Sequence, residues 1–207
     1  MKKLTLFLVF IGLVSFIFAQ QTISYSDFAE EETVKINDDE IQTVMSSFEL
    51  KRISGFGGPT ISYTAIDGEF AVMNGGGGGV IVNNMFFGGY GEGLSNYVNT
   101  SIGNLEFGHG GFWVGYEFFP HRMFHPVIST RLGWGQAKGV TAQNEGFKEA
   151  FFAVVPTASL EINFTQFFKL NVGAEYRRTF GIDSMGGLDD NNFSNAGVYM
   201  SFIFGWF

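Results

Sequence analysis

The sequence predicts an all-β fold, namely an eight-stranded antiparallel up-and-down transmembrane β-barrel with a short N-terminal arm. Three observations favour this fold: stretches in which apolar and polar residues alternate, connections that alternate between short and long, and an export signal. The composition agrees, because the 207 residues include 29 Gly and 26 Phe, while only 15% are charged. The absence of Cys excludes a disulfide scaffold, a thiolate zinc site and a cysteine nucleophile.

Residues 1–19 have the features of a secretory signal peptide. Lys2 and Lys3 precede an apolar stretch over residues 4–18, and Ala19 is a small residue at a suitable cleavage point. The stretch is shorter than the ~20 residues that a transmembrane helix needs. Loss of the two lysines changes the formal net charge from −8 to −10. An exported protein this acidic is not expected to bind nucleic acid, which requires Lys and Arg against phosphates.

Residues 20–53 are predicted to form an acidic N-terminal periplasmic arm, with one short helix between Asp38 and Phe48. The segment holds eight of the 20 acidic residues: Asp27, Glu30, Glu31, Glu32, Asp38, Asp39, Glu40 and Glu49. It is interpreted as a solvated leader. The alternative is a segment that plugs the barrel or binds a periplasmic partner.

Residues 54–207 are predicted to form the barrel, because apolar residues recur there at every second position. From Phe168 to Arg177, for example, every second residue is apolar and the residues between are polar or small. The predicted strands cover residues 55–66, 75–83, 86–94, 104–119, 125–138, 149–163, 167–181 and 194–207. Glycine blurs the pattern in the first three.

The predicted connections alternate strictly between two kinds. Short turns are expected at residues 83–84, 120–124 and 164–166, and longer polar loops around Asp67 and over residues 95–103, 139–148 and 183–192. Outer-membrane barrels have short periplasmic turns and longer external loops. An even number of strands also leaves both termini on the periplasmic side.

Aromatic residues cluster beside the short turns and the C-terminus, where they predict a periplasmic aromatic belt at the membrane–water interface. Its core members are Phe86, Phe118, Phe168, Phe204 and Trp206, with Phe87, Phe119, Phe124, Phe164 and Phe167 nearby. Frequent phenylalanine alone is the simpler explanation, but it does not account for the clustering.

On the signal peptide, the alternation of turns and loops, and the terminal Phe207, residues 55–207 resemble the small eight-stranded outer-membrane β-barrel proteins of the OmpA/OmpX-like architecture. The resemblance implies an outer-membrane location, contact with outer-membrane lipids, and a role for Phe207 as the signal that the barrel-insertion machinery recognises. Phe207 departs from the pattern, because the apolar register of the last strand ends on Trp206. The resemblance supplies no catalytic motif.

The interior of an eight-stranded barrel is just wide enough for side chains to fill. The inward positions predict a lumen polar network of Glu117, Arg131, Glu161, Lys169, Glu175 and Arg177. Buried charges persist when they are paired, so this balanced set predicts a closed polar plug. Glu161 is expected directly opposite Lys169, and Trp113 opposite Arg131 as a possible cation–π pair. A conducting or binding lumen is the alternative.

The glycines at positions 75–79, 88–93 and 108–111 are predicted to let strands coil and to leave room for large inward side chains such as Trp113 or Tyr90. The competing interpretation is a phosphate-binding loop. The run at 75–79 lacks the Lys-Ser/Thr of a P-loop, and no helix pattern follows it.

Candidate chemistry is sparse, and no metal site or cofactor is predicted. His109 is a weak catalytic candidate, with Ser101 and Glu106 as possible partners in a lipid-modifying site near the outer rim. His121 and His125 flank a turn, so their spacing does not make one metal-binding face, and both are expected at the interface. The last loop, with Asp183, Asp189, Asp190, Asn191 and Asn192, is interpreted as a solvated acidic loop, since it lacks EF-hand spacing.

The function predicted from these features is a structural or surface-interaction role in the outer membrane, without turnover. Three alternatives remain: a lipid-modifying enzyme at the outer rim, a narrow solute channel, and a soluble periplasmic lipocalin-like barrel. The last requires an apolar interior, the reverse of residues 168–177.

Overall fold

The structure is a computed structural model that describes residues 52–100, 103–140, 146–183 and 186–207. The predicted signal peptide and almost all of the predicted arm lie outside the described residues. The described part of the chain belongs to one compact unit. No helix in it is long and apolar enough to cross a bilayer.

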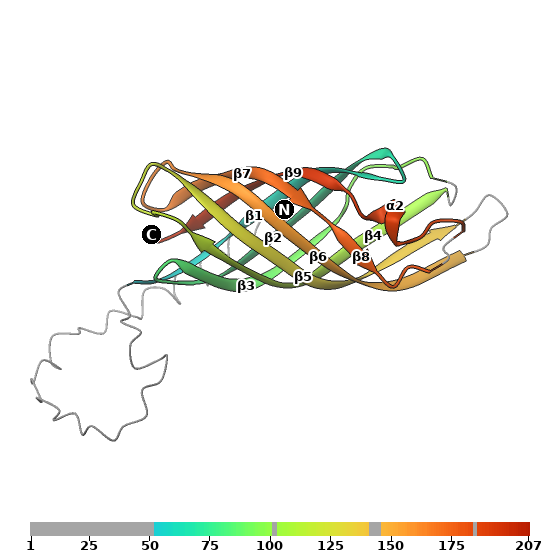
Figure 1. Cartoon of the computed structure of the whole chain (residues 1–207), viewed down its shortest axis with the longest axis horizontal. Coiled ribbons are helices and arrows are strands. Elements are labelled where there is room, and N and C mark those ends of the chain that lie inside the picture. Colours follow the sequence, from blue (N-terminus) through green and yellow to red (C-terminus); the bar gives the residue numbers. More distant parts are fainter. Residues whose placement is uncertain (1–51, 101–102, 141–145, 184–185) are drawn as a thin grey trace, which may run out of the picture. The chain divides into compact units, whose positions relative to one another are not determined.

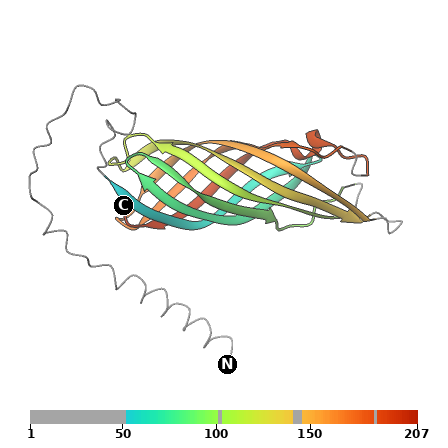
Figure 2. The same ribbon diagram turned by 90° about the horizontal axis from the view of Figure 1, so that it is seen from below.

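The described chain folds into a closed antiparallel β-barrel (Figure 1). Its strands are β1 Ile53–Ile66, β2 Glu69–Val82, β3 Met85–Leu94, β4 Asn104–Glu117, β5 Phe124–Val140, β6 Gly146–Asn163, β7 Phe168–Tyr176, β8 Arg178–Phe180 and β9 Ala196–Gly205. Neighbours pair in the order β5-β4-β3-β2-β1-β9-β7-β6, and pairing of β5 with β6 closes the ring. Because β7 and β8 both pair with β6, the nine labelled strands make an eight-membered ring. Figure 2 shows the strands inclined to the barrel axis and wrapping around it.

Successive connections lie at alternate ends of the barrel (Figure 1). One end, called here the turn end, carries the turns at residues 83–84, 118–123 and 164–167 together with the C-terminus. The other end, called here the loop end, carries the connections from β1 to β2, from β3 to β4, from β5 to β6 and from β8 to β9. The last of these includes the single helical turn α2, Asp190–Phe193.

The prediction of a longer loop between the first two strands is wrong. Ile66 and Glu69 are joined only by Asp67 and Gly68, whose φ values are 54° and 78°. Type I′ turns require positive φ at both central residues, and they join two antiparallel strands because their twist matches that of the strands. Asp-Gly is a favoured sequence for such turns. The strand β2 therefore begins at Glu69 rather than at residue 75. The strict alternation of short and long connections consequently fails at this point.

The strand predicted over residues 167–181 is interrupted once, at Arg177. The pairing register with β6 is the same on both sides of the break, from Thr157↔Glu175 to Val154↔Arg178. Pro156 lies in the gap and has no backbone N–H to donate to the ladder. The break is therefore local and leaves the barrel closed.

Side chains alternate between the interior and the outer surface along each strand. On β6, Ala153, Val155 and Thr157 are buried, whereas Ala158 and Leu160 are exposed. The same alternation appears on β7, where Lys169 and its odd-numbered polar neighbours are buried. Because apolar residues face outward and charged residues inward, the outer surface suits a bilayer rather than water.

Candidate functional site

The barrel interior contains two apolar clusters with charged side chains between and beside them. The larger cluster includes Ile66, Met73, Val98, Leu105, Phe107, Phe151, Ile182, Leu188 and Phe193. The smaller one consists of Ile81, Phe86, Tyr90, Trp113, Val127 and Tyr199, with Phe56 and Phe207 against it. All six residues of the predicted polar network are buried, with exposures between 1% and 5%.

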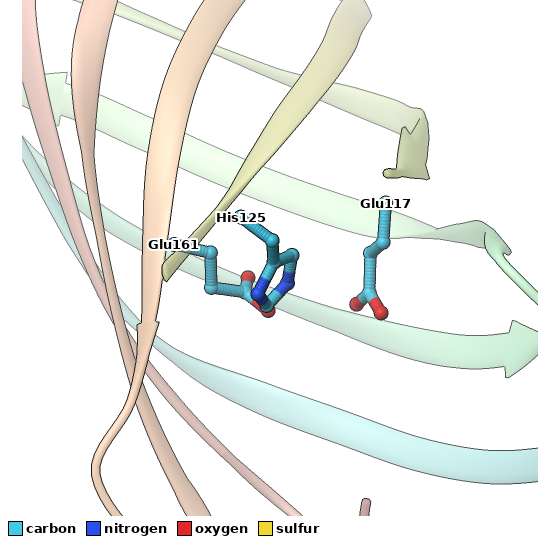
Figure 3. Close-up of side chains that lie close together, drawn as sticks. All are labelled: Glu117, His125 and Glu161. Atoms are coloured by element: carbon cyan, nitrogen blue, oxygen red, sulfur yellow. The ribbon is translucent and has the colours of Figure 1, made fainter. Parts of the chain in front are cut away.

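Four of the buried polar residues form a cluster near the turn end, called here the turn-end cluster: Glu117, His125, Glu161 and Lys169. Lys169 Nζ lies 2.7 Å from Glu161 Oε1 and 3.2 Å from Glu117 Oε1. His125 Nε2 lies 3.1 Å from the same Glu161 oxygen. Figure 3 shows Glu117, His125 and Glu161 projecting into one region of the interior from β4, β5 and β6.

Two expectations about the turn-end cluster are wrong. Glu161 pairs across the ladder with Asn171, and Lys169 with Asn163, because the β6–β7 turn contains four residues. The ion pair of Glu161 and Lys169 still forms, but along a diagonal. His125 is fully buried rather than interfacial, whereas His121 is exposed.

A second charged group lies around Arg131 on β5. Its guanidinium donates hydrogen bonds to Glu92 Oε2 and to Glu175 Oε2, so that one cation bridges two carboxylates. Its carbon Cζ lies 5.1 Å from the ring centroid of Tyr199 and 5.5 Å from that of Tyr90. Arg131 pairs across the ladder with Trp113 as predicted. The cation–π partners are nevertheless the two tyrosines and not Trp113.

His109 is buried and lies beside this second group. Its Nε2 lies 3.0 Å from Glu92 Oε1, and its Nδ1 lies 2.8 Å from the hydroxyl of Tyr90. The predicted acid partner, Glu106, is instead exposed and lies 3.8 Å from Lys138. The other predicted partner, Ser101, falls outside the described residues. The acid beside His109 is therefore Glu92 and not Glu106.

Arg177 connects the interior to the loop end. Its Nε donates to the carbonyl oxygen of Phe193, at 2.9 Å, and its Nη2 donates to that of Ala65, at 3.3 Å. Its Cζ lies 5.0 Å from the ring centroid of Phe107. Arg177 thus ties the turn of α2 to the apolar cluster below it.

The last loop is more ordered than the predicted solvated acidic loop. Asp189 caps α2 by accepting a hydrogen bond from Asn191 N at 2.8 Å. Asp190 accepts hydrogen bonds from Gly181 N and Ile182 N. These carboxylates bind backbone N–H groups and so organise the loop.

Glycines make room for the large interior side chains, as the sequence predicts. A Cβ added at Gly77 would lie 2.9 Å from the ring of Trp113. A Cβ at Gly135 would lie 2.7 Å from the ring of Phe151 and from Cβ of His109. Because barrel interiors of this size are filled completely, small residues must face large ones.

The outer surface carries exposed aromatic residues at the turn end. Phe204 is 48% and Trp206 77% exposed, and Phe168 stacks between Phe164 and Phe204 at centroid distances of 5.5 and 5.1 Å. Phe118 lies 4.9 Å from Tyr116. Phe86 was predicted to belong with these residues but is only 6% exposed. In the pair Phe86–Phe87 the first ring points inward, 5.4 Å from Trp113, and the second faces outward.

A second group of exposed aromatic residues, which the sequence did not reveal, lies on the outer surface toward the loop end. Trp134 lies 5.2 Å from Phe152 and 6.4 Å from Phe112. Tyr63 stacks on Phe70 at 6.1 Å. These residues are scattered along the sequence, and only the strand register brings them side by side.

The terminal residue Phe207 packs against the smaller interior cluster, in keeping with its position out of phase with Trp206. Its ring centroid lies 4.2 Å from Lys169 Nζ, and its backbone N–H donates to the carbonyl oxygen of Gln166. The C-terminus thus closes over the turn-end cluster.

Comparison with solved structures identifies the fold. Neisserial surface protein A has a TM-score of 0.57 to this chain, with 11% sequence identity, covering 74% of this chain and 96% of that protein. The N-terminal β-barrel domain of OprF from Pseudomonas aeruginosa has a TM-score of 0.53 and 11% identity, covering 76% and 100%. This is the fold of the small eight-stranded outer-membrane β-barrels. The sequence itself matches no family model and no curated protein.

The buried carboxylates of the two charged groups are all paired. Each carboxylate of the two charged groups lies within hydrogen-bond distance of a cation or a histidine. Glu92 and Tyr199 belong to these groups but are not predicted by the sequence, whereas Tyr90 is predicted only as a large inward side chain. Glu92 could have been found from its alternation with Phe86 and Tyr90, which the intervening glycines conceal.

Proposed function

We propose that this chain is an integral outer-membrane β-barrel with a structural or surface-interaction role and a lumen closed by side chains. Export through a cleaved signal peptide and insertion by the barrel-insertion machinery, with Phe207 as the signal, belong to the same proposal.

The observation that carries the proposal is the outward face of β5. From Phe124 to Trp134 the outward residues are Phe124, Pro126, Ile128, Thr130, Leu132 and Trp134, none of them charged. Ten residue steps of about 3.3 Å in a strand tilted by about 40° rise roughly 25 Å, the height of the apolar band of such barrels. Aromatic residues flank that band at both ends, as they do at membrane interfaces.

The proposed closure of the lumen rests on the contents of the interior. Arg131 bridges Glu92 and Glu175 in the middle of the barrel, and Phe107 stacks on Phe151 and Phe193 above it. An open ion path would require these rings and ion pairs to separate. Separation would leave buried charges unpaired, at a cost of several kcal/mol.

Membrane fractionation tests the location, and planar-bilayer recording tests the closed lumen. We expect the protein in the outer-membrane fraction, resistant to extraction by carbonate, with a gel mobility that changes on heating. We expect no discrete conductance steps from the purified barrel. Recovery in the soluble periplasm would refute the membrane assignment, and reproducible single-channel steps would refute the closed lumen.

The lipid-modifying alternative receives less support than the closed barrel. The side chain of His109 is completely buried and its two ring nitrogens face Glu92 and Tyr90. A histidine so placed has no access to a lipid substrate. Turnover of phospholipid in liposomes that is lost in His109→Ala would favour the enzyme instead.

A further inference from the structure

The turn-end cluster brings together three side chains of the kinds that bind transition metals. One ligand atom each from Glu117, His125 and Glu161 lies within 4.8 Å of the other two, and all three residues are buried. They come from three adjacent strands at one level of the barrel (Figure 3). Imidazole nitrogen and carboxylate oxygen are among the ligands that Zn²⁺ takes in proteins.

The hydrogen bonding of His125 orients one nitrogen toward the carboxylates. Its Nδ1 lies 3.2 Å from the carbonyl oxygen of Arg122, which can only accept, so Nδ1 carries the hydrogen and donates. In the neutral ring, Nε2 then presents a lone pair to Glu161 Oε1 at 3.1 Å, and two acceptors face each other. Only a proton held between the two atoms or a cation shared by both makes this contact favourable. Donation of the second ring N–H to a backbone carbonyl is the arrangement that holds metal-binding histidines.

Asn171 on β7 lies beside the cluster, since its Nδ2 donates to Glu161 Oε2 at 3.4 Å, and two buried acceptor atoms lie nearby. Neither Glu117 Oε2 nor Asn171 Oδ1 has a hydrogen-bond partner within the described part of the chain. Asn171 is only 3% exposed, and with Glu117 and Glu161 it lines one small internal cavity. Unsatisfied buried acceptors are costly, and oxygen atoms in this position can complete a metal's coordination.

Lys169 is the resident cation of the cluster, and a metal ion must displace its ammonium group. Lys169 balances one of the two carboxylates, so the four residues carry a net charge of −1 when His125 is neutral. The flexible side chain of Lys169 allows its ammonium to move. The ring of Phe207, whose centroid lies 4.2 Å from Nζ, remains within reach as a cation–π partner. Arg52 marks the access route, since its side chain contacts Glu117 at 4.0 Å and is 21% exposed.

We propose that the turn-end cluster is a binding site for a divalent transition-metal ion such as Zn²⁺. The ligands are His125 Nε2 and the carboxylates of Glu161 and Glu117, with water in the fourth position or, if the Asn171 amide turns over, Asn171 Oδ1. Occupancy links β4, β5, β6 and β7 at the turn end, which makes the site a metal-dependent clamp on that end of the barrel.

The test is a titration of the full chain, refolded in detergent and stripped with a chelator, with ZnCl₂ alone. Isothermal calorimetry is expected to show one Zn²⁺ per folded chain, and Co²⁺ is expected to give the intense visible absorption of a nitrogen- and oxygen-ligated ion. His125→Gln should weaken Zn²⁺ binding roughly 100-fold or more, since even indirect supporting groups contribute 10–100-fold. The matched control is His121→Ala, which removes the exposed histidine of the same turn and should leave affinity unchanged.

Folding is verified for each variant by heat-modifiable mobility, and Glu161→Gln replaces His125→Gln if the latter does not fold. Absence of Zn²⁺ binding by the folded wild-type chain would refute the site. Equal affinity in wild type and His125→Gln would also refute it, as would an equal loss in His121→Ala. Each of these three results would assign the His125–Glu161 contact to a proton held between the two side chains.

Discussion

Lys169 Nζ lies 2.7 Å from Glu161 Oε1, although the β6–β7 ladder pairs Lys169 with Asn163 and Glu161 with Asn171. The ion pair therefore runs diagonally between strands, a separation that long side chains can span. The same ammonium also forms an ion pair with Glu117 on β4, at 3.2 Å. One cation thus stabilises two buried carboxylates that belong to two other strands.

Lys169→Met should destabilise the barrel by about 3–5 kcal/mol, because removal of one partner leaves buried carboxylates uncompensated. Reversible urea unfolding in detergent, followed by tryptophan fluorescence, measures the change. Lys138→Met is the matched control, since the Lys138 side chain is 49% exposed and its ammonium lies 3.8 Å from Glu106. Its expected effect is at most about 1 kcal/mol. Similar stabilities for the two variants would show that Lys169 does not neutralise the turn-end cluster.

Leu170→Arg should impair assembly, because Leu170 faces outward in the apolar band, two residues from Phe168 at the turn end. A charged residue on the lipid face costs about 2–4 kcal/mol at the bilayer midplane and less toward the interfaces. The yield of heat-modifiable protein in the outer-membrane fraction measures the effect. Gln166→Arg, in the exposed β6–β7 turn, is the control and should assemble normally. Normal yield of Leu170→Arg would mean that β7 faces the other way.

Gly77→Ala should destabilise the barrel by about 1–3 kcal/mol, the usual cost of overpacking. The new Cβ would meet the ring of Trp113 at 2.9 Å and the carbonyl oxygen of Gly89 at 2.8 Å. Gly91→Ala is the control, since no atom lies within 4 Å of its added Cβ. Urea midpoints compare the two variants. Equal midpoints would indicate that the glycines in β2 and β3 do not serve to accommodate interior rings.

Asp190→Ala should loosen the last loop without unfolding the barrel. Asp190 accepts hydrogen bonds from the N–H groups of Gly181 and Ile182, and neither group would keep this partner. Protease added to intact cells should cleave the variant faster within residues 181–195, while its heat-modifiable mobility stays normal. Asp183→Ala, on the exposed part of the same loop, should be cleaved at the wild-type rate. Protection equal to wild type in Asp190→Ala would show that other contacts hold the loop.

The sequence predicts the fold well where the two faces of a strand differ in polarity. On β6 and β7 near the turn end, the lumen side is charged and the outer side apolar. The alternation therefore predicts both that these residues form strands and which side chains point inward. Toward the loop end, inward residues are apolar too. The run Phe70–Met73 therefore shows no alternation, which is why the first six residues of β2 were missed.

The interior contacts depend on register, which a sequence fixes only through the turns. The β6–β7 turn has one residue more than predicted. The ladder partner of Lys169 is therefore Asn163 and not Glu161. Similarly, Glu92 meets His109 because β3 and β4 pair directly at these positions. The nearer carboxylate in sequence, Glu106, faces outward. Alternation predicts which side of the sheet a residue occupies, but register decides what it touches.

The membrane assignment depends on the outward apolar band, which site-directed spin labelling along β5 tests directly. The chain contains no Cys, so single cysteines can be introduced and labelled one at a time from position 124 to 134. In native outer membranes, labels at even positions such as Ile128 and Leu132 should be relaxed by oxygen and not by a water-soluble nickel complex. Labels at odd positions, such as Val127, should be immobile and reached by neither agent. Access of the nickel complex to positions such as 128 and 132 would contradict a lipid-facing outer surface.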